Sequence, residues 1–210
     1  MRTSTLYLFI AIILISGCAR PYRKISMSSI PFINYREESK ISYAVRQGVL
    51  YNMKDYFFAR RENKKNVSLV AFKIVNKTDL PLNINDLQFT CGATVPISTI
   101  PVIDFYNTIK QKPGAYWAYS ALGVVYPKPT NKSESKTLVK DGKLYIPLPF
   151  GVFVGAANFG FAYSANKKML QDFQLLDLSN RVIQPHDSIQ GILTFKNVAN
   201  CGDIFVTVKE

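Results

Sequence analysis

The stretch that decides the fold is Val67-Ser68-Leu69-Val70-Ala71-Phe72-Lys73-Ile74-Val75-Asn76. Its central part, Leu69 to Val75, is nearly all apolar, which is typical of a strand in the core of a sandwich. Lys77-Thr78-Asp79 predicts a turn. The following residues, Leu80 to Asn85, alternate with a period near two, and Leu87 to Phe89 continue the pattern. Pro81 places this second strand at an edge or at a strand start, because proline cannot donate to a sheet ladder.

Further strands are expected on both sides of this stretch. Ile41 to Arg61 carries many strand formers, and Gly48 is expected to divide it into two strands. Near the C-terminus, strands are expected at Arg181 to Ile183, Ser188 to Phe195 and Asp203 to Lys209. The pattern at both ends of the chain therefore favours antiparallel sheets.

Residues 92–178 interrupt the strand pattern and are expected to form a long insertion. Within it, Lys136 to Pro147 predicts a hairpin, because Asp141-Gly142 between apolar runs favours a type I′ turn. Tyr116 to Leu122 predicts a short helix. A longer helix is expected from about Phe150 to Leu175, starting just after Pro149.

The apolar part of this insertion, residues 144–166, carries no charge. Its three glycines make it a poor helix in isolation, at about 1 kcal/mol each, so packing must hold it. Asn158 would be costly in hydrocarbon, and an uninterrupted run of about 16 residues falls short of the roughly 20 that a span needs. Three interpretations stay open. The segment is a buried element that covers the sandwich, a membrane span, or a partner surface that comprises Gly151, Gly155, Gly160 and Trp117.

The N-terminus carries an export signal. Arg2 precedes an unbroken apolar run from Leu6 to Ile15, which rises only about 15 Å as a helix and is typical of a signal-peptide core. The run ends in Leu14-Ile15-Ser16-Gly17-Cys18, which resembles the lipobox of bacterial lipoproteins. The resemblance implies that residues 1–17 are removed and that Cys18 carries the lipid (palmitate or another acyl chain). Residues 18–40 would then be a lipidated tether. The alternative is an uncleaved anchor with an incidental cysteine.

The strand motifs also resemble the Ig-like sandwiches of bacterial envelope lipoproteins. The residues that carry this resemblance are the core strand that ends in Asn76, the Pro81-Leu82-Asn83-Ile84 edge strand, and the late pattern of Pro185, Ser188, Gly191 and Phe195. We therefore expect a mainly β chain. Its domain, residues 41–210, would be an Ig-like antiparallel β-sandwich with an insertion at about 92–178 that contains a β-hairpin and one or two apolar helices.

The net charge of +12 is unevenly distributed. Residues 19–65 carry a net +7, whereas residues 151–210 carry none. The excess either meets anionic headgroups, at about 1 kcal/mol per basic side chain, or belongs to solvated segments. Nucleic acid is not an expected partner, because the signal peptide predicts that the protein is exported from the cytoplasm.

Few residues are candidates for a disulfide, for catalysis or for metal binding. In an oxidising compartment Cys91 and Cys201 either pair, which would close a loop worth roughly 4–5 kcal/mol, or remain separate buried thiols. The single histidine, His186, lies in a Pro-His-Asp sequence that reads as a surface turn, although Ser188 is close by. We expect no catalytic residue, no metal and no cofactor.

These features predict a lipid-anchored envelope protein with a non-enzymatic binding or assembly role. Ala19, where an aspartate would favour the inner membrane, suggests the outer membrane. The alternative is a carbohydrate- or peptidoglycan-binding module. Its sugar-stacking faces would come from Tyr106, Tyr116, Trp117, Tyr119 and Tyr126.

Overall fold

The structure is a computed structural model that describes residues 18–32, 35–92, 94–122, 139–140, 143–144, 150–196, 198 and 201–209. The chain divides into two compact units. Unit 1 comprises residues 1–21 and 111–165, and unit 2 comprises residues 22–110 and 166–210. The expected signal peptide, the Asp141-Gly142 turn and Tyr126 lie outside the described residues.

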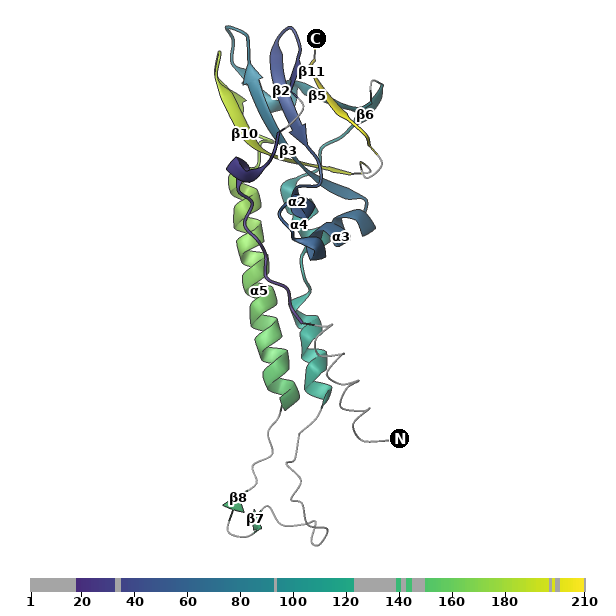
Figure 1. Ribbon diagram of the computed structural model, residues 1–210, viewed down its shortest axis with the longest axis vertical. Coiled ribbons are helices and arrows are strands. Elements are labelled where there is room, and N and C mark those ends of the chain that lie inside the picture. The colour runs from purple at the N-terminus through teal and green to yellow at the C-terminus, as the bar shows by residue number, and fades with distance from the viewer. Residues whose placement is uncertain are drawn as a thin grey trace. The chain divides into compact units, whose positions relative to one another are not determined.

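Unit 2 contains a four-stranded antiparallel sheet. Its strands are β1 (Tyr35–Glu37), β2 (Ile41–Arg46), β3 (Val67–Asn76) and β10 (Ser188–Lys196), in the order β1-β2-β3-β10. The strand expected at Val67–Asn76 is confirmed, and it lies between β2 and β10 (Figure 1). Its pairing with β10 runs through nine residues, from Ser188↔Val75 to Lys196↔Val67.

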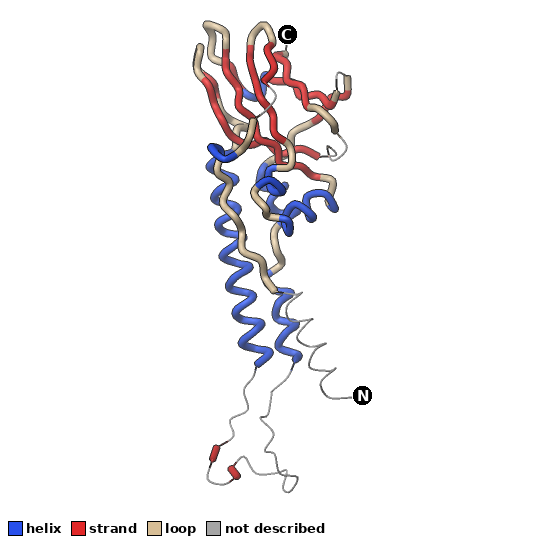
Figure 2. Tube along the Cα trace, viewed as in Figure 1, coloured by secondary structure: helices blue, strands red, loops and turns tan. Residues whose placement is uncertain are grey.

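A second antiparallel sheet holds β11 (Ile204–Val208), β5 (Leu87–Cys91) and β6 (Val95–Ile97), in that order. A separate pair is formed by β4 (Leu82–Asn83) and β9 (Val182–Ile183). A single 3₁₀ turn, η2 (Ile84–Asp86), interrupts the alternating stretch that the sequence predicted as continuous. The strands of unit 2 are drawn in red in Figure 2 and lie close together.

One apolar core draws on both sheets. Phe72 and Phe195 of the first sheet meet Phe89 of the second, with ring centroids 5.4 to 6.0 Å apart. Aromatic pairs in this range add about 0.5–1.5 kcal/mol each beyond the area that they bury. The same core includes Ile41, Tyr43, Val70, Ile74, Leu87, Leu193, Ile204 and Val206. The antiparallel sheets that the sequence predicted are therefore present.

The second strand expected between Gly48 and Arg61 is wrong. The structure has two helices there, α2 (Val49–Asn52) and α3 (Tyr56–Lys64). Gly48 adopts a positive φ of 65° and ends the strand, so its role as a break was correct. Phe58, Ala59 and Glu62 are buried at helical spacing, and this period was hidden by the number of aromatic strand formers.

The expected insertion at 92–178 is too wide. Its first part contains β6 and a helix, α4 (Val102–Ile109), which belong to unit 2. Val102, Phe105 and Ile109 are buried, and the Phe105 ring lies 5.6 Å from that of Phe173. In Figure 1, α2, α3 and α4 cluster at one end of the sheets. The class is therefore mixed α and β rather than mainly β.

The remaining part of the insertion has the expected elements. The long helix α5 (Phe150–Leu176) begins where Pro149 predicted, and a 3₁₀ helix, η3 (Pro113–Leu122), contains the short helix expected at Tyr116 to Leu122. Two short strands, β7 (Val139–Lys140) and β8 (Lys143–Leu144), pair as the predicted hairpin. In the described part of the chain, no helix combines the length and apolarity that a membrane crossing requires.

Residues 18–40 are not a simple tether. Tyr22, Ile25 and Ile30 are buried, and the segment contains η1 (Met27–Ser29) and the edge strand β1. The Tyr22 ring contacts Phe58 and Phe173 edge-on, with centroids 6.1 Å away in both cases. The polar composition and the two prolines suggested a loose segment, but every few residues an apolar side chain enters the core.

Candidate functional site

The residues that follow Cys18 are fixed to unit 1 by two buried amide side chains. Cys18 itself is exposed. The backbone N–H of Ala19 donates to Asn158 Oδ1 of α5 at 2.7 Å. Asn158 is only 7% exposed, and its Nδ2 donates to the Val154 carbonyl at 2.9 Å. The oxygen and the nitrogen of this amide therefore both have a hydrogen-bond partner, within the apolar first half of α5.

The second amide is that of Gln111. Its Oε1 accepts from the Arg20 N–H at 3.0 Å, and its Nε2 donates to the Arg20 carbonyl at 2.7 Å. The Tyr116 hydroxyl donates to the same Oε1 at 2.9 Å. Gln111 thus pairs with the Arg20 backbone in the way that a neighbouring strand would. We call Asn158 and Gln111 the anchor clamp.

Sequence reasoning missed the anchor clamp. Asn158 was treated only as a cost, because an amide in an apolar run argues against a membrane span. The available signal was its isolation: it is the one amide between Phe150 and Ala165. A lone buried amide must find partners, and a backbone segment without its own secondary structure supplies them.

The four residues expected to form a partner surface do not share one role. Gly151 and Gly155 are buried on α5, whereas Gly160 is exposed. A Cβ at Gly155 would lie 3.1 Å from the Tyr116 carbonyl oxygen, and one at Gly160 would meet nothing within 4 Å. Gly155 therefore permits the close approach of η3. No neighbouring element among the described residues lies close to Gly160.

Trp117 lies on η3 and remains 45% exposed. Its ring is 6.0 Å from that of Phe159 on α5. Other large side chains of unit 1 are exposed along the first half of α5. They are Val152, Phe153, Phe159, Phe161 and Tyr163. We call these five residues and Trp117 the aromatic surface.

The aromatic residues expected to stack on sugars are only partly brought together. Tyr116 and Tyr119 lie on η3 with nearly parallel rings, 10° apart in plane and 6.3 Å between centroids. Tyr106 lies on α4 in the other unit. The described residues therefore place Tyr116, Trp117 and Tyr119 on one element, but not the full set.

In unit 2, two buried carboxylates hold the chain after Pro21. Asp172 Oδ2 accepts from the Tyr22 hydroxyl at 2.6 Å and from the Ile25 N–H at 2.7 Å. Asp55 Oδ2 accepts from the Arg23 N–H at 3.1 Å. Burial raises the pKa of Asp55, and burial with the Asp172 hydrogen bond raises the pKa of Tyr22 well above its usual value.

Among the carboxyl groups that the structure describes, that of Glu62 has the most strongly raised pKa. Burial raises its pKa to about 7, although its Oε1 accepts from the Leu69 N–H at 2.5 Å. It lines a pocket of about 400 Å³ together with Arg46, Asn52, Asn63 and Ser68, among others. The hydrogen bond to Leu69 joins α3 to the start of β3, which gives Glu62 a structural role.

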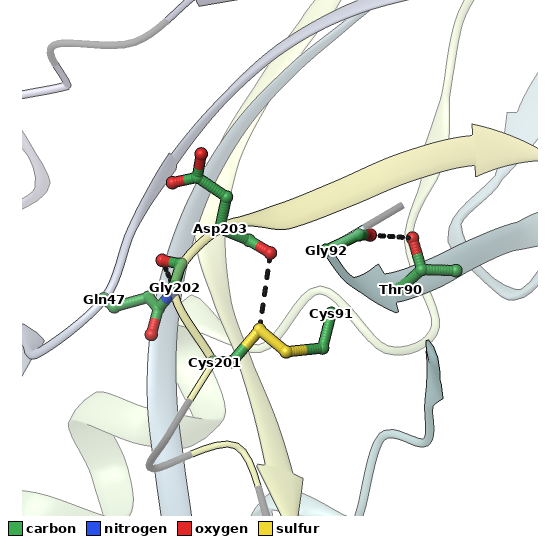
Figure 3. Close-up of a disulfide and its surroundings, with 7 residues drawn as sticks. All are labelled: Gln47, Thr90, Cys91, Gly92, Cys201, Gly202 and Asp203. Atoms are coloured by element: carbon green, nitrogen blue, oxygen red, sulfur yellow. Dashed lines mark hydrogen bonds between the residues drawn. A yellow bond between two sulfur atoms is a disulfide. The ribbon is translucent and has the colours of Figure 1, made fainter. Parts of the chain in front are cut away.

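Cys91 and Cys201 form a disulfide, with Cα atoms 5.5 Å apart, so the structure has the first of the two alternatives left open above (Figure 3). Cys91 ends β5 and Cys201 precedes β11. Gly92 follows Cys91 with a φ of 60°, where its carbonyl accepts from Thr90 Oγ1 at 3.0 Å. Both cysteines lie in unit 2, and the bond ties β5 to the start of its neighbour β11.

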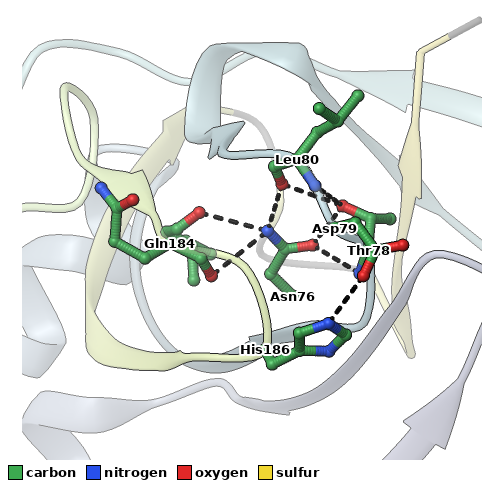
Figure 4. A network of polar contacts seen from close by, with 7 residues as sticks. Asn76, Thr78, Asp79, Leu80, Gln184 and His186 are labelled. Carbon is green, nitrogen blue, oxygen red and sulfur yellow. Dashed lines mark hydrogen bonds and ion pairs between the residues drawn. The ribbon is translucent and has the colours of Figure 1, made fainter.

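His186 lies in an exposed turn, as expected. Its Nε2 is 2.9 Å from Asp79 Oδ1. Beside it, the buried Asn76 donates through Nδ2 to the carbonyls of Leu80, Ile183 and Gln184, and its Oδ1 accepts from Thr78 (Figure 4). This network joins the end of β3 to the turn before β10, and the exposed contact between His186 and Asp79 lies beside it.

The assignment of the site rests on the geometry of this chain. Among the residues that the structure describes, no three side chains of His, Cys, Asp or Glu gather as a metal ion would require. No protein-family model, curated protein or solved structure matches the chain.

Proposed function

We propose that the protein is a lipid-anchored component of the cell envelope, with a non-enzymatic binding or assembly role. The observation that carries this proposal is the anchor clamp. Asn158 and Gln111 hold Ala19 and Arg20 directly after the exposed Cys18. An acyl group on Cys18 would therefore be attached at a fixed place on unit 1, which suits a protein that works close to its membrane.

Unit 2 supplies the scaffold in this proposal. We interpret its two antiparallel sheets around one core as a variant of the Ig-like sandwich, with α2, α3 and α4 added at one end. The disulfide between Cys91 and Cys201 fits an oxidising, extracytoplasmic address. Ala19 favours the outer membrane.

Replacing Cys18 with Ser in the full-length chain tests the anchor. The wild-type protein should incorporate labelled palmitate, lose residues 1–17 and fractionate with the outer membrane, and Cys18→Ser should abolish all three. Ser16→Ala is the matched control, because it keeps a small residue at that position and leaves Cys18 in place. Acyl label retained by Cys18→Ser would overturn the proposal.

The second candidate is binding to carbohydrate or peptidoglycan. Trp117 is exposed, and the Tyr116 and Tyr119 rings on the same helix are parallel, as a sugar-stacking platform would need. Sedimentation with purified peptidoglycan tests it. Loss of co-sedimentation in Trp117→Ala, with retention in Tyr106→Ala, would support this candidate.

A further inference from the structure

The first half of α5 is apolar around its whole outer side. The exposed residues from Val152 to Ser164 are Val152, Phe153, Ala156, Ala157, Phe159, Gly160, Phe161, Tyr163 and Ser164. None is charged, and only Ser164 and Tyr163 carry a polar group. A helix that is apolar all round is normally buried in a protein core or in a membrane.

The second half of the same helix is different. From Asn166 onward, Lys167, Lys168, Gln171 and Gln174 are exposed, while Met169 and Phe173 are buried. This is the ordinary pattern of a helix with one side in water. The helix therefore changes its expected surroundings at about residue 165, which is also where unit 1 ends.

The anchor identifies what covers the apolar half. Ala19 is hydrogen-bonded to Asn158, which lies at the middle of this half, so Cys18 sits on the same unit as the aromatic surface. A lipid on Cys18 would therefore enter the bilayer from the unit that carries the aromatic surface. Tryptophan and tyrosine, here Trp117 and Tyr163, are the residues enriched at the boundary between lipid and water.

Charge points to the same occupant. Residues 111–165 contain six lysines and two acidic residues. Basic segments of this kind are attracted to anionic headgroups. A protein partner or a second copy would be expected to mix polar side chains into its contact, and none of the exposed residues from 152 to 164 is charged.

We propose that the aromatic surface of unit 1 is immersed in the headgroup and outer acyl region of the bilayer that receives the lipid on Cys18. This inference rests on the proposed function, because it takes Cys18 as the anchor. The aromatic surface then acts as a second membrane attachment, and two attachments on the same unit fix the orientation of unit 1 on the bilayer.

Trp117 is the only tryptophan of the chain, so its fluorescence reports on this surface alone. The acylated mature protein is reconstituted into vesicles of phosphatidylethanolamine and phosphatidylglycerol, with or without bromine on the acyl chains. We expect a loss of Trp117 emission in the brominated vesicles. Phe161→Asp should restore much of that emission. Leu175→Asp is the matched control, because Leu175 is 71% exposed on the second half of α5 and Phe161 is 67% exposed on the first.

Equal emission in both kinds of vesicle, from protein whose mass shows the acyl group on Cys18, would overturn the inference and leave the proposed function standing. Trp117 that is shielded from acrylamide but not quenched by bromine would mean that protein covers the surface, which also overturns it. If the mass shows no acyl group, the proposed function fails. Flotation of that unacylated chain with the vesicles, with quenching, would still support the membrane surface, whereas its remaining in the buffer would overturn it.

Discussion

Asn158 Oδ1 accepts the Ala19 N–H at 2.7 Å, and this bond joins residues 139 positions apart in the sequence. It explains why a polar side chain interrupts an apolar helix: the amide binds the backbone next to the anchor. With Gln111, it makes the residues after Cys18 part of the folded unit.

Asn158→Leu should release Ala19 from α5. The substitution keeps the branched shape of the side chain but removes the acceptor, so a partly buried N–H loses its partner at a cost of about 1–3 kcal/mol. Amide hydrogen exchange at Ala19 and Arg20 should become faster. Asn180→Leu, in an exposed turn, is the control and should leave that exchange unchanged. Unchanged protection in Asn158→Leu would show that the clamp does not hold the segment.

Two glycines of α5 should respond in opposite directions. Gly155→Leu should lower the unfolding free energy by about 1–3 kcal/mol, because its side chain would push against the Tyr116 carbonyl and the Trp117 ring. Gly160→Ala meets no atom within 4 Å and should raise the stability of the helix by up to about 1 kcal/mol. Thermal unfolding measures both. A stabilising Gly155→Leu would contradict the close packing of η3 on α5.

Gly191 of β10 should tolerate no side chain. Its Cβ would lie 2.6 Å from Leu178 Cδ2 and also too close to the Leu176 carbonyl. Gly191→Ala should therefore lower the unfolding free energy by about 3 kcal/mol, the upper end of overpacking costs. Gly202→Ala, which meets nothing within 4 Å, is the comparison in a denaturant titration. Equal midpoints for the two variants would refute this packing.

The sequence predicted the elements whose pattern is local. β3, β10, β11 and α5 are revealed by their own apolar spacing, and the hairpin of β7 and β8 by its turn. The predictions from the sequence were wrong where contacts between residues far apart in the chain determine the local structure. Val49 to Lys64 is rich in aromatic residues that favour strands, yet it forms two helices, in which Phe58 and Ala59 are buried. No local pattern predicts that Gly191 lies against Leu178, or that Asn158 binds Ala19.

The same difference between local patterns and distant contacts applies to the candidate site residues. Cys18 and the pair Cys91 and Cys201 are identified by chemistry that needs few neighbours. The sequence grouped Gly151, Gly155 and Gly160 by their place in one apolar segment, and added Trp117 for its aromatic ring. The structure divides them because a helix turns by about 100° per residue, so Gly155 and Gly160 face different surroundings.

The disulfide should contribute much of the stability of unit 2. Cys91 and Cys201 are separated by 110 residues, and removing such a link costs about 2–5 kcal/mol. Non-reduced protein should present no maleimide-reactive thiol at these positions after unfolding, and reductant should lower the denaturant midpoint. Cys18→Ser removes the third cysteine from the count. Two reactive thiols in that freshly purified variant would rule out the bond.

Glu62 should make the protein less stable as the pH rises towards neutrality. Its pKa is about 7 in the folded chain against 4.5 for an exposed glutamate, so the folded state binds the proton more tightly than the unfolded state. The extra stability is fully present below about pH 4.5 and is lost as the pH rises to about 7. The loss is on the order of 3 kcal/mol, from about 1.4 kcal/mol per pKa unit.

Glu62→Gln should remove most of this pH dependence, because the amide stays neutral and its oxygen can still accept from the Leu69 N–H. The unfolding free energy is measured by denaturant titration at several values between pH 4.5 and pH 8. Asp55, whose pKa is also raised by burial, leaves a smaller slope of the same sign. His186→Gln is the control, since the only histidine is exposed and its removal should not change the slope that Glu62 causes. The prediction would be contradicted if the unfolding free energy of Glu62→Gln still fell with rising pH while that of His186→Gln no longer did.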